Sequence, residues 1–241
     1  MSRVSVVTVA LDNARGLEAT LGSLARLGEK PHDVIVIDGG SRDDTGDVVR
    51  THSNKLNIRY VSEPDRGIYD AMNKGRRLAS GDLVHYLNAG DTVLGEPYGN
   101  VSGPCLLAVH IHDDAGRFLF DDFVKHGGFG YCHQGILFAR DHPDYREEYR
   151  VAADLDLIVA SFPRGLRALP RSATGAVRFA FGGLSSRATS TRNREVCRIL
   201  FQRLPWWTAS HVYLGIELKN LVPRALRRAM VGALAPRGQR R

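Results

Sequence analysis

Short, uncharged apolar runs alternate with helical stripes of leucine between residues 4 and 87, and this alternation limits the possible folds more than any other feature. Val4–Val9 and Val34–Ile37 contain no charged residue, as expected for strands that are buried on both faces. Between them, Leu17, Leu21 and Leu24 recur at helical spacing. Strands that alternate with helices form right-handed crossovers. The sequence therefore predicts an α/β fold with a mainly parallel sheet flanked by helices.

The same pattern continues up to residue 91 and becomes looser beyond it. We predict helices at 44–50, 68–78 and 151–162, and further strands at 58–61, 83–87, 106–111, 118–120 and 136–138. We expect residues 1–186 to form a single domain, divided into halves at 1–91 and 92–186.

The net charge of +7 is unevenly distributed along the chain. Residues 187–241 contain 12 lysines and arginines against 2 acidic residues, whereas residues 1–186 contain 21 basic and 24 acidic residues. A nucleic-acid-binding domain is expected to carry its own basic face, so the slightly acidic body argues against nucleic acid as a partner. The basic segment 187–241 is predicted to be helical.

The cysteines and the positions and lengths of the apolar runs indicate the expected cellular location of the protein. Cys105, Cys132 and Cys197 are scattered without metal-binding or disulfide-like spacing, which favours reduced thiols. The first strand begins at Val4, leaving no room for a signal peptide, and no apolar stretch is long enough to span a bilayer. We therefore expect a cytoplasmic protein.

Polar residues stand at the carboxyl ends of the first predicted strands. In a parallel sheet these ends line the crevice where ligands bind. Glycines allow a ligand to approach the backbone, and carboxylates suit sugar hydroxyls, base N–H groups or a hard cation. The strand ends read Thr8-Val-Ala-Leu-Asp12-Asn13, Asp38-Gly-Gly-Ser41-Arg-Asp43, Glu63-Pro-Asp65-Arg66-Gly67 and Asn88-Ala-Gly90-Asp91.

Two common phosphate-binding signatures are absent from the sequence. No G-x-G-x-x-G follows the first strand, and no G-x-x-x-x-G-K-[ST] occurs. Phosphates would then need a divalent cation, Mn²⁺ or Mg²⁺, which proteins often bind through one or two carboxylates plus the substrate's phosphates. Asp91 is the candidate ligand.

Several of these motifs, in this order and spacing, resemble family 2 glycosyltransferases of the A-type fold. The resemblance covers residues 3 to 186 and rests on Val4–Asn13, on Asp38–Thr45, on Glu63-Pro-Asp-Arg-Gly-Ile-Tyr-Asp-Ala-Met-Asn-Lys-Gly75 and on Gly81-Asp82. The later Cys132-His-Gln134, Ala153-Asp-Leu-Asp156 and Phe181-Gly-Gly-Leu-Ser185 resemble a branch that builds bacterial cell-surface polysaccharides and glycolipids.

The resemblance implies inverting transfer of a sugar from a nucleoside-diphosphate sugar to a hydroxyl of a glycolipid, lipid-linked or polysaccharide acceptor. Residues 1–91 would form the donor-nucleotide half and residues 92–186 the acceptor half. The amino end of helix 68–78 would favour the diphosphate. The expected donor contacts are Thr8, Asp12, Asp38, Asp65, Gly67, Asp70, Asn73 and Asn88.

The resemblance also assigns the metal and the base. Asp91 matches the last position of the family's D-x-D-like metal motif, but Asn88-Ala-Gly-Asp91 contains only one acidic residue. Asp154 matches the family's catalytic aspartate and is favoured over Asp156, although Asp154 could instead cap the following helix. His133 and Gln134 are candidate acceptor contacts, and a purely structural role for them is equally open.

The basic carboxyl-terminal segment has two interpretations. Trp206-Trp207 stands amid arginines and spaced apolar residues, a composition typical of an element lying on an anionic membrane surface. Residues 205–241 would then hold the enzyme on the inner face of the plasma membrane, with Pro205 and Pro223 dividing them into short helices. The alternative is a helix packed on the domain, followed by a disordered basic end.

Two other functions stay open on the sequence alone. A nucleotidyltransferase that makes the sugar nucleotide could share the sheet, but it would be expected to show a glycine-rich basic phosphate loop after the first strand. A catalytically degenerate sugar-nucleotide-binding scaffold would explain the single acidic residue at 88–91.

Overall fold

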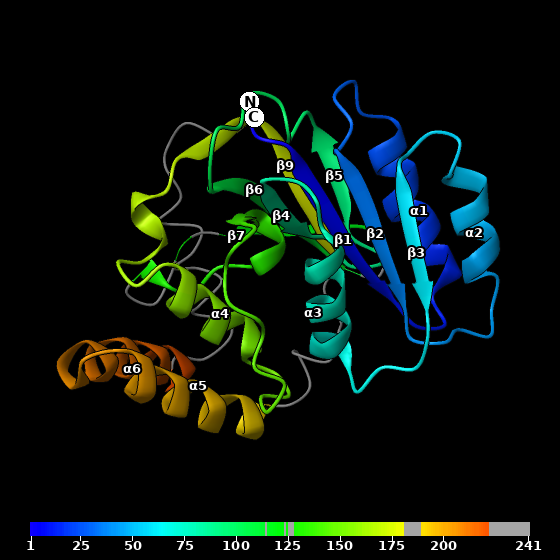
Figure 1. Cartoon of the computed structure of the whole chain (residues 1–241). Helices are drawn as coiled ribbons and strands as arrows, with labels where there is room; N and C mark the ends of the chain where they lie inside the picture. Colours follow the sequence, from blue (N-terminus) through cyan, green and yellow to red (C-terminus); the bar gives the residue numbers. More distant parts are fainter. Residues whose placement is uncertain (114, 123, 125–127, 181–188, 222–241) are drawn as a thin grey trace.

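The computed structural model describes residues 1–113, 115–122, 124, 128–180 and 189–221 (Figure 1). In chain order its elements are β1 (Val4–Ala10), α1 (Ala14–Ala25), β2 (Asp33–Asp38), α2 (Thr45–His52), β3 (Ile58–Ser62), α3 (Ile68–Leu78), β4 (Leu83–Tyr86), β5 (Thr92–Gly95), β6 (Cys105–His112), β7 (Phe118–Asp122), the 3-10 turn η2 (His133–Gly135), β8 (Ile136–Ala139), α4 (Ala153–Ser161), the 3-10 turn η3 (Leu166–Ala168), β9 (Arg171–Ala180), α5 (Thr189–Arg203) and α6 (Trp206–Leu221).

One sheet runs through the whole domain, with strand order β3-β2-β1-β4-β8-β6-β9-β5 and with β7 paired to β6. The first four strands in this order are parallel. Beyond β4 the sheet is mixed, because β8 is antiparallel to both β4 and β6, whereas β6 and β9 are parallel. The α/β prediction is confirmed, and the parallel pairing it expected is concentrated in the first half.

Helices cover the parallel half on both faces. Figure 1 shows α3 in front of β1, with α1 and α2 on the other side. The close approach of α3 depends on Gly75, since a Cβ there would lie 2.3 Å from Cγ1 of Val7. The register of these parallel strands brings their carboxyl ends to one edge of the sheet.

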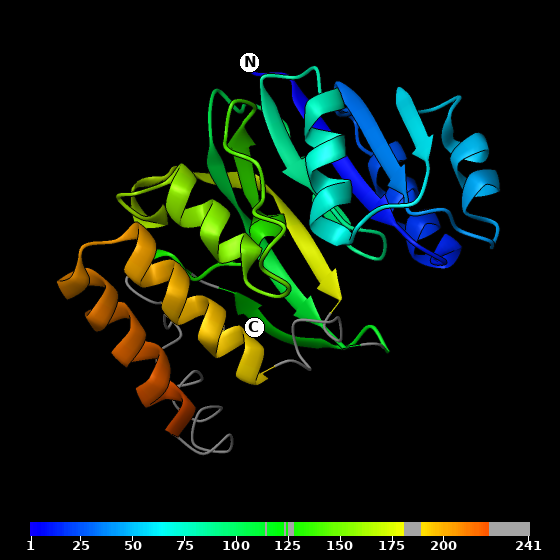
Figure 2. The same ribbon diagram turned by 60° about the horizontal axis from the view of Figure 1, so that its bottom comes forward.

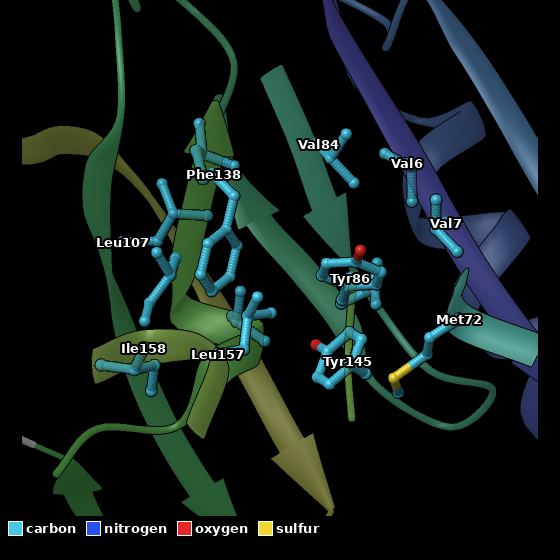
Figure 3. Packing of buried hydrophobic residues seen from close by; sticks show 14 of the residues in the cluster. Val6, Val7, Met72, Val84, Tyr86, Leu107, Phe138, Tyr145, Leu157 and Ile158 are labelled. Atoms are coloured by element: carbon cyan, nitrogen blue, oxygen red, sulfur yellow. The ribbon is translucent and has the colours of Figure 1, made fainter. Parts of the chain in front are cut away.

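The core is continuous across both halves of the sheet. Figure 3 shows Tyr86 of β4 between Met72 of α3 and Phe138 of β8, with Leu157 of α4 beside Phe138. All four side chains belong to one buried cluster. Helix α4 is therefore packed on the same core as the nucleotide half, which fixes its distance from the edge of the parallel strands.

The carboxyl-terminal helices form a pair beside α4. Figure 2 shows α5 next to α4 and α6 running back along α5. The predicted break at Pro205 is confirmed, because α5 ends at Arg203 and α6 begins at Trp206. The predicted break at Pro223, like the motif Phe181–Ser185, lies outside the described residues. Within the part of the chain that the structure describes, no helix has the length and apolarity needed to cross a bilayer.

Candidate active site

The strand ends of the first half meet at one edge, as predicted. Thr8 of β1 lies between Val36 of β2 and the end of β4 and is fully buried. Its hydroxyl and the side-chain oxygen Oδ1 of Asn88 are buried without a hydrogen-bond partner among the described residues. Unpartnered buried polar atoms are uncommon and often mark a place where a ligand or water binds.

Asp38 ends β2 and holds the edge together. Its carboxylate accepts hydrogen bonds from the backbone and hydroxyl of Ser41, from Tyr60 at 2.8 Å and from Ser62 at 2.6 Å. Burial opposes its charge, but these hydrogen bonds outweigh the burial and hold the pKa of Asp38 below its usual value. The carboxylate is therefore charged, and a nucleoside would have to share it with these donors.

Asp12 anchors the loop that follows β1. Its backbone has a left-handed conformation, with φ of 47°, and its carboxylate accepts the backbone N–H of Arg42 at 2.8 Å. The backbone N–H of Asp12 donates to Ser41. This loop presents Leu11, which is exposed although apolar and lies next to Gly39. Leu11 was not among the predicted donor residues, and its only signal is an apolar side chain directly after a buried strand.

The loop before α3 places Asp65 beside the end of β2. The Asp65 carboxylate accepts the backbone N–H of Gly67 at 2.9 Å, and its other oxygen would lie 2.8 Å from a Cβ at position 39. Glycine at 39 therefore leaves room for Asp65. Gly67, with φ of 131°, has a backbone conformation that other residues rarely adopt.

Two predicted donor residues, both buried on α3, are engaged by protein groups. Asp70 accepts the backbone N–H of Arg66 at 3.0 Å and pairs with its guanidinium, and these contacts lower the pKa of Asp70. Asn73 bonds both the N–H and the C=O of Tyr145, at 2.8 and 2.9 Å. The contacts of Asn73 favour a role in holding α3 to the segment before α4, whereas those of Asp70 hold the loop before α3.

Helix α1 shapes the loop at 88–91. Asn13 donates to the carbonyl of Ala89 at 3.1 Å. The Thr20 hydroxyl accepts the backbone N–H of Gly90 and donates to the carbonyl of Asp91 at 2.7 Å. The loop is thereby fixed on both sides of Gly90, which has φ of 110°.

Asp91 is buried, with 4% of its surface exposed. Burial raises the pKa of Asp91 to about 7, against hydrogen bonds from the backbone of Ala180 and the side chain of Gln134 that act the other way. A nearby cation would stabilise such a carboxylate. The described residues include no group of three or more His, Cys, Asp or Glu side chains suited to a metal, so a cation at Asp91 would take its other ligands from a substrate's phosphates.

The turn η2 connects Asp91 with α4. Gln134 contacts Asp91 and accepts the thiol hydrogen of Cys132 at 2.8 Å. His133 lies on the other side, with Nδ1 3.9 Å from Oδ2 of Asp154. The Nε2 atom of His133 is buried and has no partner among the residues described. The structure therefore brings His133 and Gln134 together with both predicted carboxylates.

The two aspartates of α4 have different surroundings. Asp156 is buried and forms a two-point ion pair with Arg203, at 2.8 Å for both contacts. Asp154 is partly exposed, and its Oδ1 accepts the backbone N–H of Leu155. Its alternative as the helix cap is wrong, because Ala152 is the N-cap residue. Of the two carboxylates, that of Asp154 is partly exposed and lies near η2.

Negative charge concentrates at this turn. Burial raises the pKa of the Cys132 thiol well above its usual value, and the nearby carboxylates of Asp91, Asp122 and Asp154 raise it further. The thiol is thus neutral and unsuited to act as a nucleophile. The same three carboxylates therefore all lie near Cys132, at the turn between the loop at 88–91 and the start of α4.

The fold agrees with the comparisons to known proteins. The family model for glycosyl transferase family 2 matches residues 5–96. A PGL/p-HBAD biosynthesis glycosyltransferase of Mycobacterium bovis (strain BCG / Pasteur 1173P2) is 30% identical over 248 residues, covering 94% of this chain and 93% of that protein. The chain belongs to glycosyltransferase family 2.

Two solved structures are similar to this chain. TarS 1–349 of S. aureus in complex with UDP-GlcNAc has a TM-score of 0.67 and 17% identity, covering 83% of this chain and 66% of TarS 1–349. The mannosyltransferase PcManGT of Pyrobaculum calidifontis, in complex with GDP-Man and Mn²⁺, has a TM-score of 0.61 and 18% identity, covering 97% and 80% of the two chains. At these identities the likeness establishes the fold, and the predicted A-type fold is confirmed.

Proposed function

We propose that this glycosyltransferase moves a sugar from a nucleoside-diphosphate sugar to an acceptor hydroxyl, with inversion at the anomeric carbon. The observation that carries the proposal is the position of η2. Gln134 contacts Asp91, and His133 lies 3.9 Å from Asp154, so two adjacent residues of one turn reach both carboxylates. A sugar bound between these carboxylates would have its leaving group and the base on opposite faces, as inversion requires.

The donor would bind along the carboxyl ends of the parallel strands. Leu11 offers an apolar surface for the base, and Asp38 a charged acceptor for base or ribose N–H and O–H groups. Gly39 and Gly67 allow close approach of the ligand to the backbone. The unpartnered atoms of Thr8 and Asn88 would gain partners there. The complexes of TarS with UDP-GlcNAc and of PcManGT with GDP-Man support a sugar nucleotide as the donor.

In the reaction, Asp154 acts as the general base. The acceptor oxygen attacks the anomeric carbon and forms the new C–O bond, while the bond between that carbon and the diphosphate oxygen breaks. The acceptor proton goes to the Asp154 carboxylate, and the diphosphate leaves with the electron pair. Leu155 N–H bonds Oδ1 of Asp154 and leaves Oδ2 directed toward His133, where an acceptor would lie.

A divalent cation, Mn²⁺ or Mg²⁺, would be held by Asp91. Bound there, it would neutralise charge on the departing diphosphate. Gln134 donates to the same carboxylate and so orients it toward the site. The complex of PcManGT with Mn²⁺ supports a divalent ion in this fold.

For the acceptor, the proposal is a glycolipid or lipid-linked sugar. The relative from Mycobacterium bovis is named for PGL/p-HBAD biosynthesis, which supports an acceptor of glycolipid type. His133 would contact the acceptor through Nε2, which has no partner among the described residues. A hydroxyl of the acceptor could accept or donate at this nitrogen.

The decisive experiment measures transfer by the wild type and by Asp154→Asn. We expect Asp154→Asn to lower kcat by about 100-fold or more, because the base is lost. Stabilisation of the fold by UDP or GDP with Mn²⁺ should persist in a thermal-shift assay. Asp82→Asn is the control, since Asp82 lies at the opposite end of β4 and bonds Arg3.

Three results would contradict parts of this proposal. Full activity of Asp154→Asn would exclude it as the base. Nucleotide binding by the wild type without transfer to any acceptor in a broad panel would favour the scaffold. Formation of a sugar nucleotide from a sugar phosphate and a nucleoside triphosphate would identify a nucleotidyltransferase instead.

The proposal includes peripheral contact with an anionic membrane on the inner face of the plasma membrane. On α5 and α6, the side chains of Phe201, Trp206, Trp207 and Leu214 are exposed, Trp206 by 70%. The basic segment 187–241 carries 12 of the 33 lysines and arginines of the chain. Exposed tryptophans with basic neighbours suit the membrane interface. Residues 222–241, which the predicted surface also includes, lie outside the described part of the chain.

Co-sedimentation with vesicles tests this contact. We expect binding to vesicles that contain an anionic lipid, weak binding to phosphatidylcholine alone, and about tenfold weaker binding after Trp206→Ala with Trp207→Ala. Phe118→Ala, an exposed apolar position on β7, is the control. Equal sedimentation of the wild type and the double variant would exclude α6 as the contact.

A further inference from the structure

The backbone that leads into α4 is bonded to a distant part of the chain. Three consecutive backbone N–H groups, those of Arg150, Val151 and Ala152, donate to the carboxylate of Glu195 on α5, at distances of 2.8, 3.0 and 2.9 Å. The N-cap residue of α4, Ala152, has no side chain that could accept such bonds. Glu195 therefore fixes the three residues that lead into α4 and places a negative charge at the amino end of the helix, where such a charge is stabilising.

The backbone of the first helical residues is also bonded. The Tyr69 hydroxyl, on α3, forms a hydrogen bond with the backbone of Ala153. Two residues further on, the backbone N–H of Leu155 donates to the carboxylate of Asp154 at 2.8 Å. The position of Asp154 is thus set by a short stretch of backbone whose donors are bonded before and after it.

A second contact joins α5 to α4. Arg203 lies two helical turns beyond Glu195 and forms the buried two-point pair with Asp156. The middle and the carboxyl end of α5 therefore both contact α4 and the segment before it, and α4 has nine residues, too few to hold its position by backbone bonds alone.

We propose that Glu195 is a positioning residue for catalysis, because it fixes the start of α4 and thereby the direction of the Asp154 carboxylate. This inference rests on the proposed role of Asp154 as the base. Without Glu195, three backbone donors would need new partners, and the first turn of α4 would move to find them. A displacement of about 1 Å at a reacting group can lower a rate by about 100-fold.

The test compares kcat and KM for Glu195→Ala and Glu195→Gln. We expect Glu195→Ala to lower kcat by about 10- to 100-fold with little change in KM for the donor, because the nucleotide contacts lie on other elements. Glu195→Gln keeps one oxygen as an acceptor, so its kcat should lie between those of Glu195→Ala and the wild type. Arg194→Ala, at the exposed preceding position of α5, is the matched control.

Small carboxylates provide a second measurement. The Glu195→Ala variant leaves the three N–H groups facing a space where formate could bind. We expect formate to raise the kcat of Glu195→Ala severalfold and to leave that of Asp154→Asn unchanged. Unchanged kcat in Glu195→Ala would overturn the inference, and so would equal losses of activity and of nucleotide-induced stabilisation. A defect in Glu195→Ala beside a fully active Asp154→Asn would instead exclude the proposed base.

Discussion

At the scale of single residues, the buried carboxyl of Asp91 lowers the stability of the fold when it is charged, and it is also the proposed metal ligand. Its carboxyl is buried, and its pKa is raised to about 7 from a reference value of 3.8. A pKa raised by folding means that the neutral form is favoured in the folded state. The contribution of the neutral carboxyl is present below the unfolded pKa and is lost as the pH rises through 7. At alkaline pH the charged group therefore opposes folding unless a cation lies beside it.

Asp91→Asn should consequently be more stable and less active. We expect it to raise the free energy of unfolding at pH 8 by an amount on the order of 3 kcal/mol and to have little effect at pH 4, because Asn stays neutral throughout. Urea unfolding at the two pH values measures the difference. Nucleotide-dependent stabilisation by Mn²⁺ should disappear in the same variant. A loss of stability at pH 8 would contradict this account of Asp91.

The sequence predicted which residues would gather at the edge of the sheet, but not how each would be bonded. Strand ends are visible in the sequence, because buried β-branched runs stop at glycines and carboxylates. The bonding of Asn73 to Tyr145 joins residues 72 positions apart, and nothing in the local pattern indicates it. Leu11 was missed for a different reason, since an apolar residue after a strand also fits a buried loop. The proposed roles of these residues stay predictions.

At the scale of elements, the best-predicted parts are those with strong local periodicity. Helix 68–78 was predicted with the bounds that the structure has. Strand β9, Arg171–Ala180, was not predicted, because its exposed first half and its glycine weaken the alternation that marks a strand. It is held by pairing with β5 and β6, both far away in sequence. Tertiary pairing of this kind cannot be inferred from local sequence patterns.

Helix α3 gives a prediction about packing. A Cβ at Gly75 would lie 2.3 Å from Cγ1 of Val7, whereas one at Gly22 of α1 would have its nearest neighbour at 3.4 Å, on the flexible side chain of Arg26. We expect Gly75→Ala to destabilise the protein by about 1–3 kcal/mol through overpacking. Gly22→Ala should be neutral or stabilising by up to about 1 kcal/mol, because alanine favours helices.

Chemical denaturation of the two variants separates packing from helix propensity. Replacing glycine by alanine raises helix propensity at both sites. A difference in the change of unfolding free energy between the two variants therefore reports the contact with Val7. Equal stability of the two variants would mean that α3 can move away from β1 at little cost. The nucleotide-induced shift of Gly75→Ala should also fall, since α3 borders the proposed donor site.

At the scale of the whole molecule, the carboxyl-terminal segment is less separate than its charge indicates. The boundary at 186 and 187 stays a prediction, but α5 is bonded to the start of α4 through Glu195 and Arg203. Net charge distinguishes the basic segment from the slightly acidic body, whereas these contacts are specific and long-range. The composition of the segment therefore predicts a membrane-binding surface, but it does not reveal the contacts of α5 with α4.

Two buried histidines give the molecule a defined response to acid. His85 and His142 have pKa values lowered to about 4 from 6.5, chiefly by burial. A pKa lowered by folding means that stability is present above the unfolded value and is lost as the pH falls from 6.5 toward 4. Asp91 acts in the opposite sense over much of this window, because the folded state takes up its proton near pH 7. In this window the unfolded wild type therefore binds about one net proton more than the folded protein. Its free energy of unfolding should fall by roughly 1.4 kcal/mol for each pH unit of acidification.

His142→Asn tests this balance. His142 bonds the carbonyl of Pro143 and the hydroxyl of Tyr86, and Asn can keep the first of these bonds. We expect the variant to be less stable than the wild type at pH 7. Between pH 6.5 and 4 its free energy of unfolding should fall less steeply than that of the wild type, because it binds about one proton fewer on unfolding. Urea unfolding across this range gives the slope, with His32→Asn at an exposed position as the control. Parallel curves for His142→Asn and the wild type would mean that burial of His142 does not set the acid response.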